Sequence, residues 1–185
     1  MKELSLNILD VAENSVKAGA DLTEIIIDET AQELTLTIRD NGCGMSDEVE
    51  RAVTNPFYTT RTTRKVGLGV PLLKLAAEQC GGSLTIESKT SLESPTKHGT
   101  TLVATFNKEH IDFTPLGDVV STIQTLIQGH PEIDFLFVHS IGTERVTLDT
   151  REMREVLGDL PLNSYEVILW VREALLEQYA QIGKS

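Results

Sequence analysis

A carboxylate and two glycines stand where a predicted strand ends. Residues 40 to 45 read Asp-Asn-Gly-Cys-Gly-Met, and they follow a segment, residues 34 to 39, in which apolar and polar side chains alternate as in a half-buried strand. The strand would deliver Asp40 as a buried carboxylate, and Gly42 and Gly44 would let a flat ligand approach the backbone. Asp-Asn-Gly is also a common turn signal, so a tight turn without a ligand is the alternative interpretation.

Upstream of this turn, one face of a predicted helix carries a row of polar side chains. Apolar or small residues keep helical spacing from residue 4 to residue 15, and the polar row recurs at steps of three, four and three: Asn7, Asp10, Asn14 and Lys17. An amide oxygen can bind magnesium, a lysine neutralises phosphate charge, and a carboxylate can polarise a water molecule. The row therefore indicates phosphate chemistry, although a solvated helix face would have the same spacing.

Two further segments are basic or rich in glycine. Residues 55 to 65 are polar, hydroxyl-rich and basic in an otherwise acidic chain, and we interpret them as a lid over polyphosphate, with a surface loop as the alternative. Gly67-Leu68-Gly69-Val70-Pro71 then opens a predicted helix. Glycines at a helix start expose backbone N–H groups at the positive end of the helix dipole, which predicts an anion site.

In this order, the segments resemble the ATP-binding fold of the GHKL superfamily, which gyrase, the large heat-shock chaperone, histidine kinases and mismatch-repair ATPases share. The resemblance covers about residues 3 to 106 and implies an α+β fold, a two-layer α/β sandwich of the Bergerat type. Residues 9 to 20 are similar to the N box, which implies Asn14 as the magnesium ligand and Lys17 as a phosphate contact. Asp40 matches the aspartate that accepts a hydrogen bond from the adenine amino group, and Thr100 of a late Gly-Thr would lie near it.

Residues 55 to 60 are similar to the F box of histidine kinases, and residues 67 to 69 to the second glycine box at the phosphates. The resemblance implies ATP and Mg²⁺ as cofactors. The nucleotide-binding residues that it implies are Asn14, Lys17, Asp40, Gly42, Gly44, Met45, Thr59, Thr60, Arg61, Gly67, Leu68, Gly69, Val70 and Thr100.

Two departures from the family pattern bear on mechanism. Where the mismatch-repair and gyrase branch has a general-base glutamate four residues before the magnesium ligand, this chain has Asp10, which is one methylene shorter. Asp10 is therefore the candidate catalytic residue. Its presence is compatible with ATP hydrolysis but does not establish it. The second departure is the phospho-accepting histidine: only two residues precede the first helix, and all four histidines follow the N box. We therefore do not expect autophosphorylation of the usual kind.

Three function classes follow. The first is an enzyme, either an ATPase or a kinase that phosphorylates a protein partner, as the anti-sigma serine kinases of similar size do. The second is a non-catalytic regulatory module in which ATP orders the lid and changes a partner surface. The third, the head of a dimeric clamp, would need a transducer domain that 185 residues cannot hold. Asp10 favours the first class, an enzyme. The sequence predicts neither the identity of the protein partner nor whether the chain forms a homodimer.

The composition fits a cytoplasmic nucleotide-binding protein. A net charge of -12 argues against a nucleic-acid partner, because binding to a phosphate backbone needs a basic face. No apolar run is long enough to span a membrane and no signal peptide precedes the first helix, so we expect a cytoplasmic location without membrane contact. Cys43 and Cys80 lie far apart inside motif segments, which predicts buried, reduced thiols.

Residues 107 to 185 lie beyond the motifs and form a predicted C-terminal α/β extension to the core of residues 1 to 106. A helix is predicted to start at Asp112 or Thr114, and two apolar runs around Gly142 predict a hairpin.

Two more helices complete the extension. Asp149 or Thr150 would cap a short helix, and residues 163 to 166 have the form of a capping box before a longer one. Histidine-kinase domains usually have a β-hairpin before the N box, and this chain has none there. The predicted hairpin of the extension either fills that edge of the core sheet or belongs to a separate partner-binding appendage.

Overall fold

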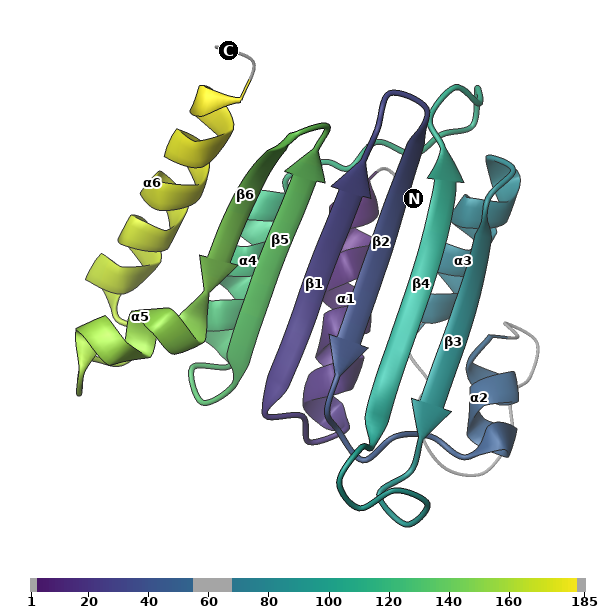
Figure 1. Ribbon diagram of the computed structural model, residues 1–185, viewed down its shortest axis with the longest axis horizontal. Helices are drawn as coiled ribbons and strands as arrows, with labels where there is room; N and C mark the ends of the chain where they lie inside the picture. The colour runs from purple at the N-terminus through teal and green to yellow at the C-terminus, as the bar shows by residue number, and fades with distance from the viewer. Residues whose placement is uncertain (1–2, 55–67, 183–185) are drawn as a thin grey trace.

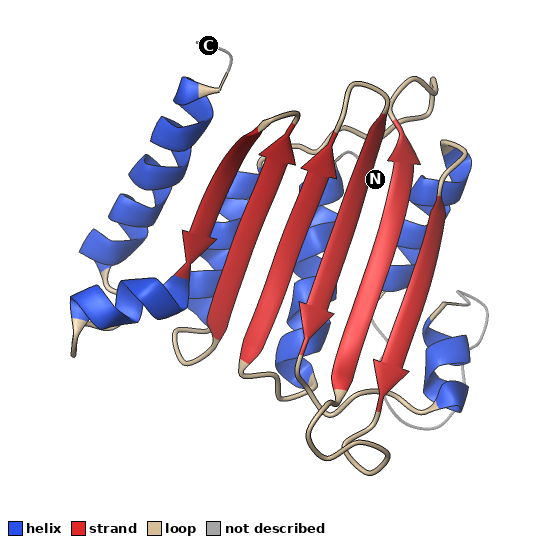
Figure 2. Cartoon of the chain, viewed as in Figure 1, coloured by secondary structure: helices blue, strands red, loops and turns tan. Residues whose placement is uncertain are grey.

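The computed structural model describes residues 3–54 and 68–182, in which a single sheet has helices on one face and beside both of its edges (Figures 1 and 2). The elements are, in chain order, α1 (Leu4–Lys17), β1 (Leu22–Glu29), β2 (Glu33–Asp40), α2 (Asp47–Val53), α3 (Gly69–Gln79), β3 (Ser83–Lys89), β4 (Gly99–Asn107), α4 (Val119–Gly129), β5 (Asp134–Ile141), β6 (Glu144–Asp149), α5 (Thr150–Leu157) and α6 (Tyr165–Gln181).

The six strands pair in the order β3-β4-β2-β1-β5-β6. Neighbours are antiparallel except β1 and β5, which run parallel. Helices α1, α3 and α4 lie behind the sheet in Figure 1, and alternate residues of β1 and β2 are buried on that side. The apolar side of α1, with Leu4 and Ile8 fully buried, packs on these strand residues to form the core. The predicted two-layer α/β sandwich is confirmed.

The hairpin of the C-terminal region belongs to the same sheet. β5 lies beside β1, with Phe137 opposite Ile25, and β6 returns to form the outer edge. α4 packs against both α1 and α6, and the Thr122 hydroxyl donates a 3.1 Å hydrogen bond to the Ser5 carbonyl. Of the two arrangements that the sequence left open, the structure therefore has the one in which the hairpin extends the core sheet.

The start of α4 differs from the prediction. The helix begins at Val119 rather than near Asp112 or Thr114, and Asp118 caps it by accepting a 2.9 Å hydrogen bond from the Ser121 N–H. The preceding residues serve another helix instead. The carbonyls of residues 115 and 116 accept hydrogen bonds of 2.9 and 2.8 Å from the first N–H groups of α1, which have no partner within that helix.

The caps of the last two helices agree with the prediction only in part. Asp149 caps α5, because its carboxylate accepts the Arg151 N–H at 2.9 Å. Ser164 is the N-cap residue of α6, but its buried hydroxyl has no hydrogen-bond partner in the described part of the chain, so the predicted capping box does not form. Within residues 3–54 and 68–182, no helix combines the length and apolar character needed to cross a membrane.

Candidate functional site

A cavity of ≈ 320 Å³ is lined by residues of α1, of β2 and of the loop that follows β2. The end of β2 and the last turn of α1 lie at the same end of the sheet in Figure 1. The loop that follows β2 forms one wall of the cavity. Apolar side chains line much of it: Val11, Ile38, Met45, Val49, Val53, Val70, Ile86 and Leu102. Its polar residues include Asn14, Ser15, Lys17, Asp40 and Thr100. An apolar cleft with a few convergent polar groups is typical of a site for a small organic molecule.

Three donors hold the carboxylate of Asp40. Its Oδ1 accepts the backbone N–H of Gly42 at 2.9 Å and that of Thr100 at 3.3 Å, and its Oδ2 accepts the Ser15 hydroxyl at 2.9 Å. The residue is half-buried rather than buried as predicted, because it opens onto the cavity. An ionised carboxylate has about four lone-pair positions, so Asp40 can accept one more hydrogen bond.

Strand pairing brings a serine to this site that the sequence did not identify. Ser88 of β3 accepts the Met45 N–H at 2.8 Å, and its hydroxyl lies 2.9 Å from that of Thr100. In the sheet register, Thr100 lies opposite both Ser88 and Asp40. Spacing along the chain gives no signal for Ser88, whereas Ser15 could have been noticed as the one hydroxyl among the apolar positions of α1.

Two positions in the loop after β2 require glycine. Gly44 has a φ of 71°, and a Cβ there would overlap the backbone carbonyl of Lys89. A Cβ on Gly42 would lie only 2.8 Å from that of Ala18 in the turn after α1. The loop therefore packs more closely against both neighbouring segments than any residue with a side chain would allow.

Further contacts fix this loop. The Cys43 N–H donates to the Ala18 carbonyl at 2.9 Å, and Nδ1 of His98 lies 2.5 Å from the Gly42 carbonyl. Because a carbonyl only accepts, His98 carries a proton on Nδ1; this residue was not among the predicted site residues. The thiol of Cys80 is buried as predicted, but that of Cys43 is exposed, because the loop turns its backbone rather than this side chain toward α1.

The fold separates the predicted polar row of α1. Asn14 and Lys17 line the cavity, whereas Asp10 is exposed and is not among the described residues that line it. Asp10 lies against the start of α3, where a Cβ on Gly69 would come within 2.7 Å of the Asp10 Cβ. Asn7 is fully buried, and its side-chain amide has no hydrogen-bond partner among the described residues. The row is therefore not a uniformly solvated face.

The other predicted nucleotide-binding residues fall into three groups. Gly44, Met45 and Val70 line the cavity, and Gly42 contacts Asp40 beside it. Leu68 and Gly69 lie at the start of α3 but are not among the described lining residues. The remaining four lie outside the described residues: Thr59, Thr60, Arg61 and Gly67.

Relatives of known sequence match just under half of the chain. Sensor protein SrrB of Staphylococcus aureus is 32% identical over 94 residues, which are 48% of this chain and 16% of that protein. Sensor histidine kinase CitA of Klebsiella pneumoniae is 29% identical over 85 residues, which are 44% of this chain and 16% of that protein. The chain thus spans only a small part of the length of these relatives.

Solved structures share the fold over more of the chain. The ATPase domain of Aquifex aeolicus MutL, complexed with ADP, matches with a TM-score of 0.55 and 13% identity, covering 94% of this chain and 88% of that one. The N-terminal domain of a DNA repair protein matches with a TM-score of 0.56 and 15% identity, covering 80% and 53%. The family model for histidine kinase-, DNA gyrase B- and HSP90-like ATPases matches residues 2–110. The chain therefore belongs to this ATPase family.

Proposed function

We propose that this chain binds ATP and ADP with Mg²⁺ in the cavity beside Asp40, and that it hydrolyses ATP or transfers its γ-phosphoryl group to a protein partner. The carboxylate of Asp40 carries the proposal. Three protein donors hold it at the cavity, and it has capacity for a fourth donor such as the amino group of adenine. The ADP complex of the similarly folded MutL domain supports a nucleotide as the ligand.

Asn14 and Lys17 fit the phosphate end of such a ligand. Both line the cavity, where an amide oxygen can bind Mg²⁺ and an ammonium group can neutralise phosphate charge. Among the described residues, no group of three or more His, Cys, Asp or Glu side chains could hold a metal ion. Magnesium in proteins is often shared between one or two side chains and substrate phosphates, so Asn14 would hold it together with the nucleotide.

Asp10 is the proposed general base. In hydrolysis it would take a proton from water as the water oxygen bonds to the γ-phosphorus and the bond from that phosphorus to the bridging oxygen breaks. In transfer to a protein, a hydroxyl group of the partner would replace the water. Asp10 is exposed beside the start of α3, so either acceptor can reach it from solvent.

The second candidate is a nucleotide-gated regulatory module without catalysis. One observation favours it: Asp10 is absent from the described lining of the cavity. In such a module, ATP would bind two conformations with different affinities and so change a surface that a protein partner contacts. For both the enzyme and the regulatory module, we propose a signalling role in the cytoplasm, without a nucleic-acid partner and without membrane contact.

Incubation with γ-labelled ATP and magnesium, alone and with lysate of the source cells, separates these functions. Free labelled phosphate would support an ATPase, and a labelled partner protein would support a kinase. Nucleotide binding without either product would support the regulatory module.

Three variants test the assigned residues. Asp40→Asn should weaken ADP binding by about 1 to 3 kcal/mol, because it leaves a polar contact badly paired, and unchanged affinity in calorimetry would remove the adenine assignment. Asp10→Asn should retain ATP affinity and lower turnover by about 100-fold or more, since the amide cannot take a proton. Asn14→Ala should impair magnesium-dependent binding and turnover together.

A further inference from the structure

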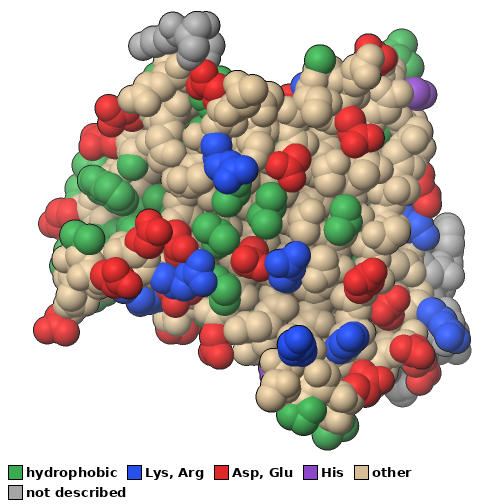
Figure 3. Space-filling view, viewed as in Figure 1, with side chains coloured by type: hydrophobic (Ala, Val, Ile, Leu, Met, Phe, Trp, Pro, Cys, Tyr) green, Lys and Arg blue, Asp and Glu red, His purple; other side chains and the backbone are tan. Residues whose placement is uncertain are grey.

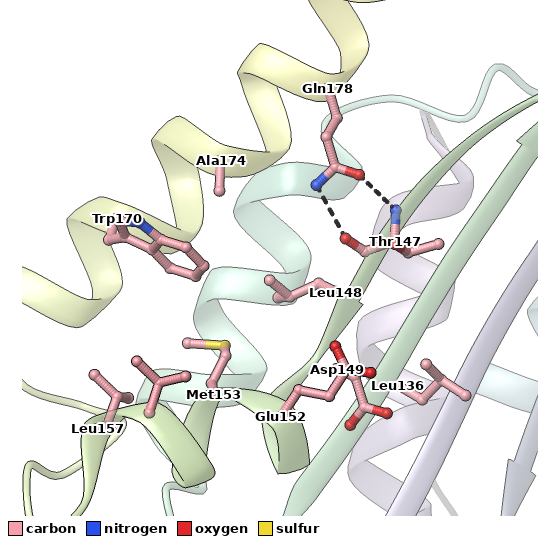
Figure 4. Close-up of a pocket in the computed structure, with 11 residues that line it drawn as sticks. Leu136, Thr147, Leu148, Asp149, Glu152, Met153, Leu157, Trp170, Ala174 and Gln178 are labelled. Atoms are coloured by element: carbon pink, nitrogen blue, oxygen red, sulfur yellow. Dashed lines mark hydrogen bonds between the residues drawn. The ribbon is translucent and has the colours of Figure 1, made fainter.

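A second cavity, of ≈ 650 Å³, lies at the opposite edge of the sheet from β3, between β6, α5 and α6 (Figure 4). We refer to it as the α5–α6 groove. Leu148 and Met153 form a buried apolar floor, and Trp170 and Ala174 of α6 face α5 across it. None of these residues belongs to the nucleotide cavity.

The rim of the α5–α6 groove leaves large apolar side chains in solvent. Val156 of α5 is 87% exposed and Trp170 is 53% exposed, and both line the groove. Leu160, in the connection between the two helices, is 45% exposed. A cluster of exposed apolar groups around a cavity is characteristic of a site for a protein partner.

The charges around the groove are acidic. Glu166, Glu173 and Glu177 lie four residues before Trp170 and three and seven after it, so they share its side of α6. Glu152 lines the groove from α5. None of these four carboxylates forms an ion pair within the described part of the chain. Figure 3 shows acidic side chains around the apolar ones over these helices.

The arginines of both helices are engaged elsewhere. Arg151 pairs with Asp149 at 2.7 Å, and Arg154 pairs with Asp134 at 2.7 Å. Arg172 lies on the side of α6 that contacts Gln124 of α4. The glutamates therefore keep their negative charge available to a ligand, which favours a basic partner.

The backbone groups of Thr147 in the edge strand β6, beside the groove, already have hydrogen-bond partners. The Gln178 side chain accepts the Thr147 N–H at 2.9 Å and donates to the Thr147 carbonyl at 3.0 Å, as a neighbouring strand would (Figure 4). Addition of a partner strand at this position of β6 would have to break both bonds. A helix that lies between α5 and α6 needs no free backbone group, so the geometry favours a helix over a strand.

We propose that the α5–α6 groove binds an amphipathic helix of a partner protein, with leucine-like side chains on the floor and lysines or arginines against the glutamates. A second copy of the chain fits less well, because each copy has a net charge of -12 and the groove itself is acidic. The proposal deepens the protein-partner part of the proposed function but does not depend on nucleotide binding.

Trp170 supplies the assay, since it is the one tryptophan of the chain. The probe is a synthetic peptide of about 18 residues with leucines at helical i, i+3, i+4, i+7 spacing and lysines elsewhere. We expect a saturable blue shift of Trp170 emission at a 1:1 ratio in the absence of nucleotide. A peptide with glutamates in place of the lysines, and a scrambled lysine peptide, should leave the emission unchanged.

A matched pair of variants tests the charge assignment. The double variant E173Q/E177Q removes two exposed carboxylates and should weaken binding about 2- to 30-fold at low salt. The control E48Q/E109Q removes two exposed carboxylates, one in α2 and one after β4, that do not line the groove, and it should bind like wild type.

Several results would overturn the proposal. Equal binding of the glutamate or scrambled peptide would show that neither charge nor the helical face is recognised. Equal loss of affinity in E173Q/E177Q and in the control would indicate nonspecific attraction to an acidic protein. A dimer in sedimentation, with Trp170 already shielded from a soluble quencher, would make a second copy the occupant. Nucleotide binding can be measured separately, so failure here leaves the ATP proposal standing.

Discussion

Replacing His139 by glutamine should make the free energy of unfolding less dependent on pH between about 5.5 and 7.5. His139 of β5 is 2% exposed, and its ring joins two elements. Its Nε2 lies 3.0 Å from the Glu29 carboxylate of β1, and its Nδ1 lies 2.7 Å from the Tyr179 hydroxyl of α6. Since a carboxylate only accepts, the neutral ring donates from Nε2 to Glu29 and accepts the Tyr179 hydroxyl at Nδ1.

Burial lowers the pKa of His139 below its ordinary value of 6.5, and the opposing hydrogen bond and charge of Glu29 do not cancel the effect. The unfolded chain therefore binds this proton at a higher pH than the folded chain does. Stability from the neutral ring is complete above about 6.5 and is lost as the pH falls toward the folded-state pKa. The slope for one proton is at most about 1.4 kcal/mol per pH unit.

A second titrating group acts in a lower pH range. Burial raises the pKa of Glu29, but hydrogen bonds from Lys108 and His139 outweigh this and leave the pKa below its ordinary value of 4.5. Stability that depends on ionised Glu29 is therefore lost only as the pH falls below about 4.5. Measurements between about 5.5 and 7.5 thus report on His139 with little contribution from its neighbour.

Urea denaturation followed by circular dichroism at the two pH values measures the effect. Glutamine at position 139 can still donate to Glu29 and accept from Tyr179, but it does not titrate. If the stability of H139Q falls with pH as steeply as that of wild type, a shifted His139 is not responsible.

Three other substitutions test contacts around the sites. Gly44→Ala should lower the thermal midpoint and the ADP affinity, because its Cβ would overlap the Lys89 carbonyl; a wild-type midpoint would contradict this. Ser15→Ala removes one donor to Asp40 and should weaken ADP binding in calorimetry by about 0.5 to 1.5 kcal/mol, and tighter binding would argue against it. Thr150→Val should destabilise the fold by about 1 to 3 kcal/mol in urea, because it leaves a buried β5 N–H unpaired; an unchanged midpoint would exclude this contact.

Local sequence patterns predicted much of the candidate site, because the residues of each pattern lie within a single strand or helix. Alternation placed Asp40 at the end of a strand, and helical spacing placed Asn14 and Lys17 on one side of α1. These periodicities follow from backbone geometry and do not depend on the rest of the fold. All three side chains line one cavity in the structure.

The parts that sequence reasoning missed depend on contacts between distant segments. Ser88 reaches Met45 only through the register of β3 and β4, and His98 reaches Gly42 from a loop 56 residues away. The start of α4 was misplaced for the same reason. Pro115 is a good helix-start residue locally, but its carbonyl is used by the N–H of Leu4 at the beginning of α1.

The division into a core of residues 1 to 106 and an extension stays a proposal. We do not expect the two parts to fold independently, because they pack closely against each other. β5 pairs with β1 along its whole length, and α4 covers α1 through a buried face that includes Ile123, Leu126 and Ile127. The carbonyls of residues 115 and 116 also complete the first turn of α1. The helix that carries Asn14 therefore receives part of its support from the extension.

A chain that stops at residue 106 should consequently fail to fold cooperatively. It would expose one edge of β1 and the side of α1 that α4 covers, and each buried aliphatic side chain that loses its partner costs about 1.5 to 3 kcal/mol. Several such losses equal the whole stability of a typical domain, about 5 to 15 kcal/mol. Urea denaturation should show no cooperative transition for residues 1–106, and calorimetry should show no ADP binding. A sharp transition with wild-type ADP affinity would mean that the core is an independent domain and that the shared sheet contributes little to its stability.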